Sequence, residues 1–360
     1  MTASIDVPDK MYGVVLTGHG GPEMLQVRDD LPVPKPGPGE VLIKVAAAGI
    51  NNTDINTRTG WYSKSVSGAS GDSGEVGETT DGGWSGAISF PRIQGADCCG
   101  TIVAAGEGVN EERIGETVIV VAMQNGLGDG SPYSMGTFGS ECDGSFAEYC
   151  TALTGEAHKV ESPLSAVELG ALPCAYSTAE GMLQKVGLKA GETVFVTGAS
   201  GGVGLAAVQL ATLREANVIA QSAASKAEIV RQNGAARIVD RGAELSTAVE
   251  ERSVDVVVDL VAGPQFPELI RMLRPGGRYV TSGAIAGPEV ALDVRDLYLK
   301  DLTFFGSTWQ PDSVFEAIVG YANDGRIKPV ISKTYPLRDI QTAQADFMSK
   351  KYPGKLVLIP

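Results

Sequence analysis

Short apolar runs separated by turn residues fill the first part of the chain. They lie at 13–16, 40–46, 101–105 and 116–122, and a proline-rich segment from Pro32 to Pro38 interrupts them. Runs of this length, bounded by Gly and Pro, are typical of β-strands. The pattern predicts an antiparallel, barrel-like β-domain that covers residues 1–160.

Strand-like and helix-like patterns alternate in the second part of the chain. We expect strands at 193–197, 217–220, 237–239, 254–259, 278–282 and 302–305, and helices at 203–214, 226–233 and 265–273. Such alternation predicts a parallel, doubly wound sheet with helices on both faces. This α/β domain is expected to cover residues 161–310.

A third segment follows Pro311. It predicts a helix at 313–323 and a closing strand at 355–359. Because a strand needs a sheet, we expect the closing strand to return to the first domain, so that residues 311–360 belong with residues 1–160.

The stretch from Ser63 to Gly86 is rich in Gly, Ser and acidic residues and has no periodicity. This composition predicts a mobile surface loop. Two interpretations stay open: a lid over an active site, and a passive insertion, since loops tolerate added length at little cost in free energy.

Composition narrows the class of protein. A chain of 360 residues with 43% hydrophobic residues exceeds one ordinary core and predicts two domains. We find no membrane-length apolar run and no secretory signal, so we expect a cytoplasmic protein without a membrane partner. The net charge of −14 excludes nucleic acid as a natural partner. Five irregularly spaced cysteines indicate reduced thiols.

The most specific motif is Thr193-Val-Phe-Val-Thr-Gly-Ala-Ser-Gly-Gly-Val-Gly-Leu205, an apolar strand, a glycine-rich turn and the start of a helix. Gly201 and Gly202 would let the backbone approach a phosphate, and Gly204 would let the helix pack on the strand. Ala199 stands where the first glycine of the dinucleotide motif is usual. The pattern predicts a dinucleotide site; the alternative is a tight turn without a ligand.

A short-chain dehydrogenase would carry a similar turn. In that class the turn lies near the N-terminus, and a Tyr-x-x-x-Lys motif supplies the acid. Here 192 residues precede Thr193 and no such motif occurs, so the class is excluded.

Several further segments, taken in order and spacing with the nucleotide turn, resemble the medium-chain dehydrogenase/reductase superfamily. Within it they are similar to the zinc-independent quinone oxidoreductase branch related to ζ-crystallin. The resemblance covers nearly the whole chain and implies a GroES-like catalytic domain with a Rossmann domain inserted near its C-terminal part. The segments are 36–45, 48–54, 95–103, 106–109, 144–149 and 354–358.

The same resemblance locates the positions that hold catalytic zinc in metal-dependent relatives. They are occupied here by Asn51, Ala96 and Cys174, and the four cysteines of the structural zinc lobe are absent. One thiolate cannot hold a catalytic zinc, which needs about three protein ligands. We therefore predict a metal-free enzyme in which Cys174 is a core or cleft thiol.

Without a metal, hydrogen-bond donors must polarise the acceptor carbonyl. The catalytic candidates are Asn51, which replaces a zinc cysteine, Thr53, at the place of a relay hydroxyl, and Tyr62. Structural alternatives remain: Asn51 could tie a loop, Tyr62 could serve packing, and Asp54 is interpreted as a structural acceptor.

The choice of cofactor depends on the end of the second Rossmann strand, where NAD enzymes usually carry an acid. That strand offers Ser222 and then Lys226 instead, and Arg241 follows the next strand. These groups favour NADPH; the alternative is that both cations are ordinary solvated side chains. The superfamily resemblance implies that Leu260, Val261, Gly283 and Ser307 line the nicotinamide side of the cofactor site. The other predicted cofactor residues are Thr178, Ser200, Gly201, Gly202, Val203, Ser222, Lys226 and Arg241.

Together these features predict an NADPH-dependent oxidoreductase that reduces a quinone or an α,β-unsaturated carbonyl compound. The alternatives are an alcohol or aldehyde dehydrogenase of the same superfamily, and a nucleotide-binding structural or sensor protein. The resemblance also implies a homodimer formed through the strand near 302–305, unless another segment of the chain covers that edge.

Overall fold

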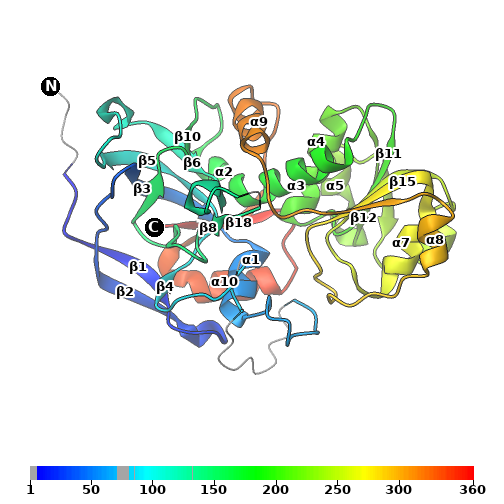
Figure 1. Cartoon of the computed structure of the whole chain (residues 1–360), viewed down its shortest axis with the longest axis horizontal. Helices are drawn as coiled ribbons and strands as arrows, with labels where there is room; N and C mark the ends of the chain where they lie inside the picture. Colours follow the sequence, from blue (N-terminus) through cyan, green and yellow to red (C-terminus); the bar gives the residue numbers. More distant parts are fainter. Residues whose placement is uncertain (1–5, 71–80, 85, 132) are drawn as a thin grey trace. The chain divides into compact units, whose positions relative to one another are not determined.

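A computed structural model describes residues 6–70, 81–84, 86–131 and 133–360. Its contacts divide them into two compact units. The first contains the described residues up to Val66, those between the 71–80 gap and Cys174, and Phe315–Pro360; the second contains a short stretch that begins at Ser67, and Ala175–Val314. Figure 1 shows the elements of both.

The first unit is built mainly from β-strands. Its longer strands are β1(Lys10–Leu16), β2(Leu25–Pro32), β3(Glu40–Gly49), β5(Cys98–Ala105), β6(Thr117–Val120), β9(Tyr149–Leu153), β17(Ile331–Pro336) and β18(Lys355–Ile359). The short ones are β4(Arg92–Ile93), β7(Met123–Gln124), β8(Gly136–Thr137) and β10(Ala157–Lys159). Its helices are α1(Asn52–Thr59), α2(Ala166–Leu169), α9(Asp312–Asn323), which begins just before the boundary at Phe315, and α10(Ile340–Met348).

A seven-stranded sheet in the order β10-β6-β5-β3-β18-β17, with β9 also paired to β3, organises this unit. Closing strand β18 pairs antiparallel with β3 through Val357 and Leu358, so the expected return of the C-terminus is confirmed (Figure 1). The named strands within residues 1–160 pair antiparallel, as predicted. The sequence did not predict β17, which runs parallel to β18. Helix α10 connects these two strands and packs on both, which allows them to run in the same direction.

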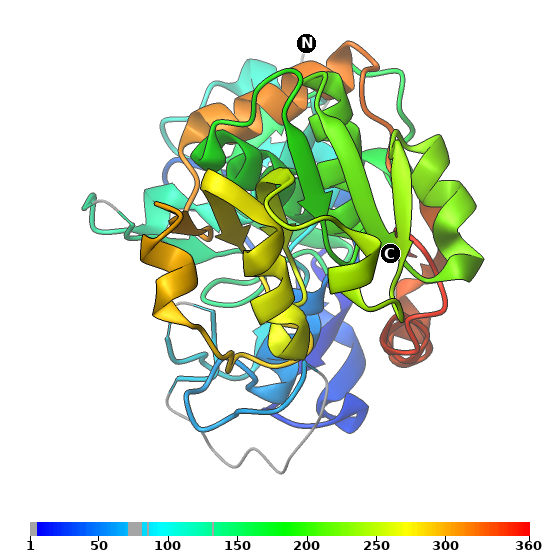
Figure 2. The same ribbon diagram turned by 90° about the vertical axis from the view of Figure 1, so that its right-hand side faces the viewer.

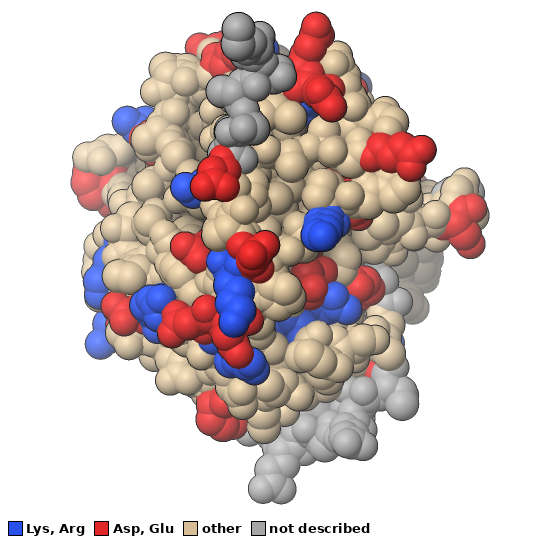
Figure 3. Space-filling model, turned by 90° about the vertical axis from the view of Figure 1, so that its left-hand side faces the viewer, with Lys and Arg blue, Asp and Glu red and all other residues tan. Residues whose placement is uncertain are grey.

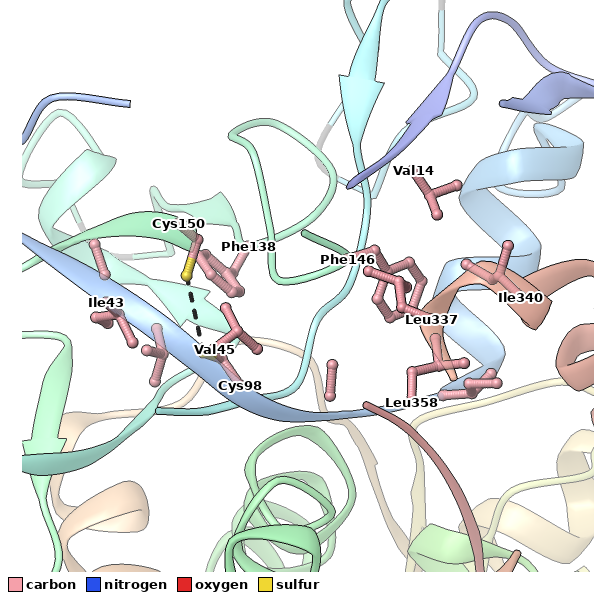
Figure 4. Close-up of a cluster of buried hydrophobic side chains, with 14 of the residues drawn as sticks. Val14, Ile43, Val45, Cys98, Phe138, Phe146, Cys150, Leu337, Ile340 and Leu358 are labelled. Atoms are coloured by element: carbon pink, nitrogen blue, oxygen red, sulfur yellow. Dashed lines mark hydrogen bonds between the residues drawn. The ribbon is translucent and has the colours of Figure 1, made fainter. Parts of the chain in front are cut away.

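The core of the first unit joins residues far apart in the chain. Strand residues such as Ile43 and Cys98 pack with Phe146 and with Leu337 and Ile340 from the C-terminal part (Figure 4). Cys98 and Cys150 face one another there, with sulfurs 3.9 Å apart, and all five cysteines are free thiols.

The second unit holds a six-stranded, fully parallel sheet in the order β13-β12-β11-β14-β15-β16. This is the 3-2-1-4-5-6 order of the Rossmann fold, so the predicted doubly wound sheet is confirmed (Figure 2). The strands are β11(Thr193–Val196), β12(Asn217–Ser222), β13(Arg237–Asp240), β14(Val254–Asp259), β15(Leu273–Thr281) and β16(Thr303–Gly306). The helices are α3(Pro173–Val186), whose first two residues precede the boundary, α4(Gly202–Leu213), α5(Ala227–Gln232), α6(Leu245–Ala248), α7(Phe266–Met272) and α8(Val294–Tyr298).

The loop expected at 63–86 falls partly outside the described residues, because 71–80 and 85 are not among them. Near its two ends the backbone N–H of Lys64 donates to Asp81 Oδ2 at 3.2 Å, and that of Gly83 donates to the carbonyl of Gly86 at 2.7 Å. Mobility of this loop stays a prediction.

Acidic and basic side chains are interspersed on the face shown in Figure 3. Ion pairs form among the described residues: Arg338 lies 2.6 Å from Asp29, Arg28 lies 2.9 Å from Asp30, and Arg113 lies 2.8 Å from Glu116. Among the described residues, none of the helices has both the length and the apolar character that crossing a membrane requires.

Candidate active site

The glycine-rich turn of the second unit connects β11 to α4. Gly198 has a φ of +57°, a conformation that favours glycine, and Gly201 caps the helix in extended backbone. A Cβ on Gly204 would lie 2.3 Å from the carbonyl oxygen of Gly198, so only glycine allows the helix to pack this closely. A Cβ on Gly201 would meet only that oxygen, at 3.5 Å. The space at the start of α4 therefore fits an anion held by backbone N–H groups.

Predicted residues Ser200, Gly201, Gly202 and Val203 all lie in this turn or in the first turn of α4. Their placement agrees with a pyrophosphate site.

A buried carboxylate organises the next part of the same unit. Asp259 ends β14, and its Oδ1 accepts from the hydroxyl of Thr197 at 2.7 Å and from the N–H of Val261 at 2.9 Å. The Tyr279 hydroxyl donates to Oδ2 at 2.7 Å, and burial followed by the Asp259 charge raises the pKa of Tyr279. The N–H of Leu260 donates to Thr197 Oγ1 at 2.8 Å. The network thus holds the predicted residues Leu260 and Val261.

Sequence reasoning did not assign roles to Thr197, Asp259 or Tyr279. The available signal was a polar residue at the carboxyl end of two apolar strands, 193–196 and 254–258, which meet at one edge of a parallel sheet.

Ser222, Lys226 and Arg241 come together at the ends of β12 and β13. The N–H of Arg241 donates to the carbonyl of Ser222 at 3.0 Å. Burial, and then the nearby charge of Arg241, lower the pKa of Lys226. Asp240 lies between them in sequence, but its oxygens accept from the N–H groups of Ala224 and Gly242 at 3.0 and 2.8 Å. Two mutually repelling cations beside a serine form a site that an anion such as a phosphate would stabilise.

The remaining predicted cofactor residues are Thr178 on α3, Gly283 after β15 and Ser307 after β16. The Ser307 N–H donates to the carbonyl of Thr281 at 2.9 Å. Its hydroxyl is buried and finds no hydrogen-bond partner among the described residues. An unsatisfied buried hydroxyl costs about 1–3 kcal/mol, so a bound group that pairs with it would stabilise this region.

In the first unit, the catalytic candidates gather at the start of α1. Asn51 is the N-cap, and its N–H donates to Asp54 Oδ2 at 2.7 Å. Asp54 Oδ1 accepts from the N–H of Ala96 at 3.2 Å. Burial is the main cause that raises the pKa of Asp54 to about 7. Asp54 therefore connects two of the three positions that hold zinc ligands in metal-dependent relatives.

Cys174, at the third of these zinc-ligand positions, is held by a second carboxylate, that of Asp97. The N–H of Cys174 donates to Asp97 Oδ1 at 2.6 Å, and Lys355 Nζ donates to Asp97 Oδ2 at 2.8 Å. Lys355 also donates to Asn51 Oδ1 at 2.5 Å. Sequence reasoning missed Asp97 and Lys355; the signal was a lysine in an otherwise apolar closing strand.

Thr53 and Tyr62 lie beside this network. The Tyr62 hydroxyl donates to Thr53 Oγ1 at 3.2 Å. Burial raises the pKa of Tyr62 to about 12, although hydrogen bonds to Thr53 and Asn56 oppose the shift. The phenol therefore stays protonated near neutral pH and keeps a proton to donate. Its ring stacks on Trp84, with centroids 6.1 Å apart.

The residues around this network do not fit a catalytic zinc. Ala96, Cys174 and Ala122 form one small apolar cluster against which Trp84 packs. A methyl group cannot ligate a metal, and the Asn51 oxygen already accepts from Lys355. Within the described part of the chain, no three His, Cys, Asp or Glu side chains are grouped as metal ligands.

Protein-family models match segments of both units. Residues 37–162 match the family model "Alcohol dehydrogenase GroES-like domain", and residues 202–322 match "Zinc-binding dehydrogenase". A quinone oxidoreductase from Lama guanicoe is 30% identical over 97% of each chain. An acryloyl-coenzyme A reductase from Metallosphaera sedula is 30% identical over 97% of this chain and 99% of its own. An alcohol-dehydrogenase-like protein from Sinorhizobium meliloti 1021 has a crystal structure that superposes with a TM-score of 0.89, at 44% identity over 98% of both chains.

The chain belongs to the medium-chain dehydrogenase/reductase superfamily of oxidoreductases. The quinone oxidoreductases are among its relatives, and its two units carry the GroES-like and Rossmann folds of that superfamily.

Proposed function

We propose that this oxidoreductase uses NADPH to reduce a quinone or the β-carbon of an α,β-unsaturated carbonyl compound, without a metal. The observation that carries the proposal is the set of groups around Asp54 and Asp97: a carboxamide, a methyl group and a single thiol stand at the three metal-ligand positions. Without a metal ion to act as Lewis acid, hydrogen-bond donors must polarise the carbonyl of the acceptor.

The Rossmann unit would hold the cofactor through the start of α4, the Asp259 network and the cations Lys226 and Arg241. A nicotinamide bound there would supply the hydride. The amide of Asn51 would donate to the acceptor oxygen, and the protonated Tyr62, linked to Thr53, would supply a proton. A quinone oxidoreductase and an acryloyl-coenzyme A reductase at 30% identity support acceptors with a conjugated carbonyl.

Turnover with a panel of acceptors tests this function. Purified protein is mixed with NADPH or NADH and with quinones, enones, saturated aldehydes and ketones, and nucleotide oxidation is followed by absorbance. We expect turnover with conjugated acceptors and a preference for NADPH. Binding of NADPH without turnover of any acceptor would instead favour a structural or sensor protein.

An alcohol dehydrogenase is the second candidate function, because the protein from Sinorhizobium meliloti is similar to alcohol dehydrogenases. Metal analysis separates the two. We expect less than stoichiometric zinc and activity that survives chelation, whereas one zinc per chain with loss of activity on chelation would contradict the metal-free proposal.

We also propose a homodimer that forms through β16. This strand stands at the end of the six-stranded sheet. The neighbouring segment exposes large apolar side chains, among them Val294, Tyr298 and Leu299, each at least 60% exposed. An unpaired strand edge beside an apolar surface favours association with a second copy.

A further inference from the structure

Lys355 places an ammonium group in the interior of the first unit. Its side chain is 3% exposed, and that of Asp97 is fully buried. Beyond Asp97 and Asn51, Nζ donates to the carbonyl of Ile50 at 3.0 Å. The three donor sites of the ammonium group thus meet three oxygens. A buried charge is tolerated only with such full pairing.

The backbone makes room for this ion pair. A Cβ on Gly49 would lie 2.4 Å from Asp97 Oδ2 and 3.0 Å from the Lys355 Cε. Gly49 ends β3, two residues before Asn51, so the pair packs directly against the strand that leads to the catalytic candidate. The location of the ammonium group is therefore fixed by β3, β18 and Asp97 together.

The contact with Lys355 shows which end of the Asn51 amide is available. An ammonium group only donates hydrogen bonds, so the atom of Asn51 that faces it at 2.5 Å is the oxygen. The amide nitrogen then lies on the other side, where its contact with the carbonyl of Gly49 is long, at 3.4 Å. An Asn51 side chain that is oriented in this way presents its N–H groups. The positive charge of Lys355 beside its oxygen polarises the amide and makes these N–H groups stronger donors.

We propose that Lys355 is a positioning residue, an inference that rests on the reductase function proposed above: through Asn51 Oδ1 it orients the amide so that its N–H groups polarise the acceptor oxygen. The positive charge that a metal ion supplies directly in metal-dependent relatives is here supplied by an ammonium group one hydrogen bond further away. Asp97 holds Lys355 in place and also fixes the backbone at Cys174.

A mutant cycle tests whether Lys355 acts through Asn51. Lys355→Met alone would leave the Asp97 carboxylate buried without its cation, so it is combined with Asp97→Asn. This neutral-pair variant is made in the wild-type and in the Asn51→Ala background. We expect kcat to fall about tenfold or more in the wild-type background, while the KM for NADPH is unchanged, because removing an oriented donor affects mainly the transition state.

In the Asn51→Ala background the same change should have little effect, since the group that Lys355 orients is already gone. The proposal is supported if the fold decrease in kcat in the Asn51→Ala background is less than a third of the fold decrease in the wild-type background. A larger loss, or no loss in the wild-type background, overturns it. The control is Lys350→Met, which removes an exposed lysine whose Nζ lies 3.4 Å from Asn52, and its kcat should match the wild type.

A spectroscopic readout separates this inference from the proposed reaction. The side-chain NH₂ signal of Asn51 is assigned in ¹⁵N-asparagine-labelled protein by its absence in Asn51→Ala. We expect this signal to shift in the neutral-pair variant and to stay in place in Lys350→Met. An unshifted signal overturns the orienting role, whereas a shifted signal in a protein that reduces no acceptor overturns only the proposed function.

Discussion

Single side chains at the ends of β12 and β13 support the proposed use of NADPH. Burial, and then the charge of Arg241, lower the pKa of Lys226. A phosphate bound near both cations would reduce the repulsion between them. Asp240, the nearest acid in sequence, has both oxygens occupied by backbone N–H groups. This arrangement supports the proposed preference for NADPH, with its 2′-phosphate, over NADH.

Replacing both cations, as Lys226→Met with Arg241→Met, should weaken NADPH binding strongly and NADH binding little. Each charge-assisted hydrogen bond to a phosphate contributes about 1.5–3 kcal/mol, so we expect a loss of roughly tenfold or more per side chain in Kd for NADPH. Titration of protein fluorescence with each nucleotide measures both constants.

Arg231→Met is the matched control, because Arg231 lies on α5 nearby and pairs with Glu228 at 2.9 Å. It should leave both constants unchanged. Equal losses for NADPH and NADH in the double variant would show that these cations do not recognise the 2′-phosphate.

In the turn between β11 and α4, the role of each glycine depends on its position. Gly204 faces the backbone of Gly198 and Ala199, with no space for a Cβ. Gly202 begins α4 at the end where the N–H groups are not paired within the helix. One glycine therefore serves packing, and we propose that the other allows a ligand to approach.

Two valine substitutions should separate these roles. In Gly202→Val, a side chain would occupy the place of the pyrophosphate, so we expect NADPH binding to be lost while the thermal unfolding midpoint changes by only a few degrees. In Gly204→Val, the clash with backbone should destabilise the fold itself. Calorimetry with and without NADPH measures both effects, and normal affinity in Gly202→Val would refute the site.

At the scale of the whole molecule, the proposed dimer accounts for the apolar surface beside β16. Val290, Leu292, Val294, Tyr298 and Leu299 are all more than a third exposed, and all lie in the segment that precedes this strand. Phe304 and Phe305, within the strand, are half-buried. Pairing of two β16 strands across a twofold axis would cover this surface.

Thr303→Pro tests this arrangement. Thr303 is the first residue of β16, and proline there removes a backbone N–H donor from the strand. We expect the wild-type protein to sediment as a dimer at micromolar concentration and the variant to sediment as a monomer with an unchanged far-ultraviolet circular dichroism spectrum. Thr303→Val, which keeps the donor, should remain dimeric. A monomeric wild-type protein would contradict the proposal at once.

The sequence by itself determined the features that local physics controls. The strand–turn–helix at 193–213 and the alternation after it predict a Rossmann sheet, because glycine conformation and the periodicity of apolar residues act over a few neighbours. The return of β18 to the first sheet also followed, since an apolar strand needs hydrogen-bond partners. The presence of Asn51, Thr53 and Tyr62 as candidates came from their spacing and from the family resemblance.

Only the tertiary structure decided what these candidates contact. Lys355 and Asn51 are 304 residues apart, and Lys355 and Asp97 are 258 apart, so no local pattern contains their interaction. The parallel pairing of β17 with β18 likewise depends on where α10 packs. Burial is the physical reason in each case: the same lysine would be an ordinary solvated cation at the surface, and it orients Asn51 because the fold removes water and leaves three oxygens as its partners.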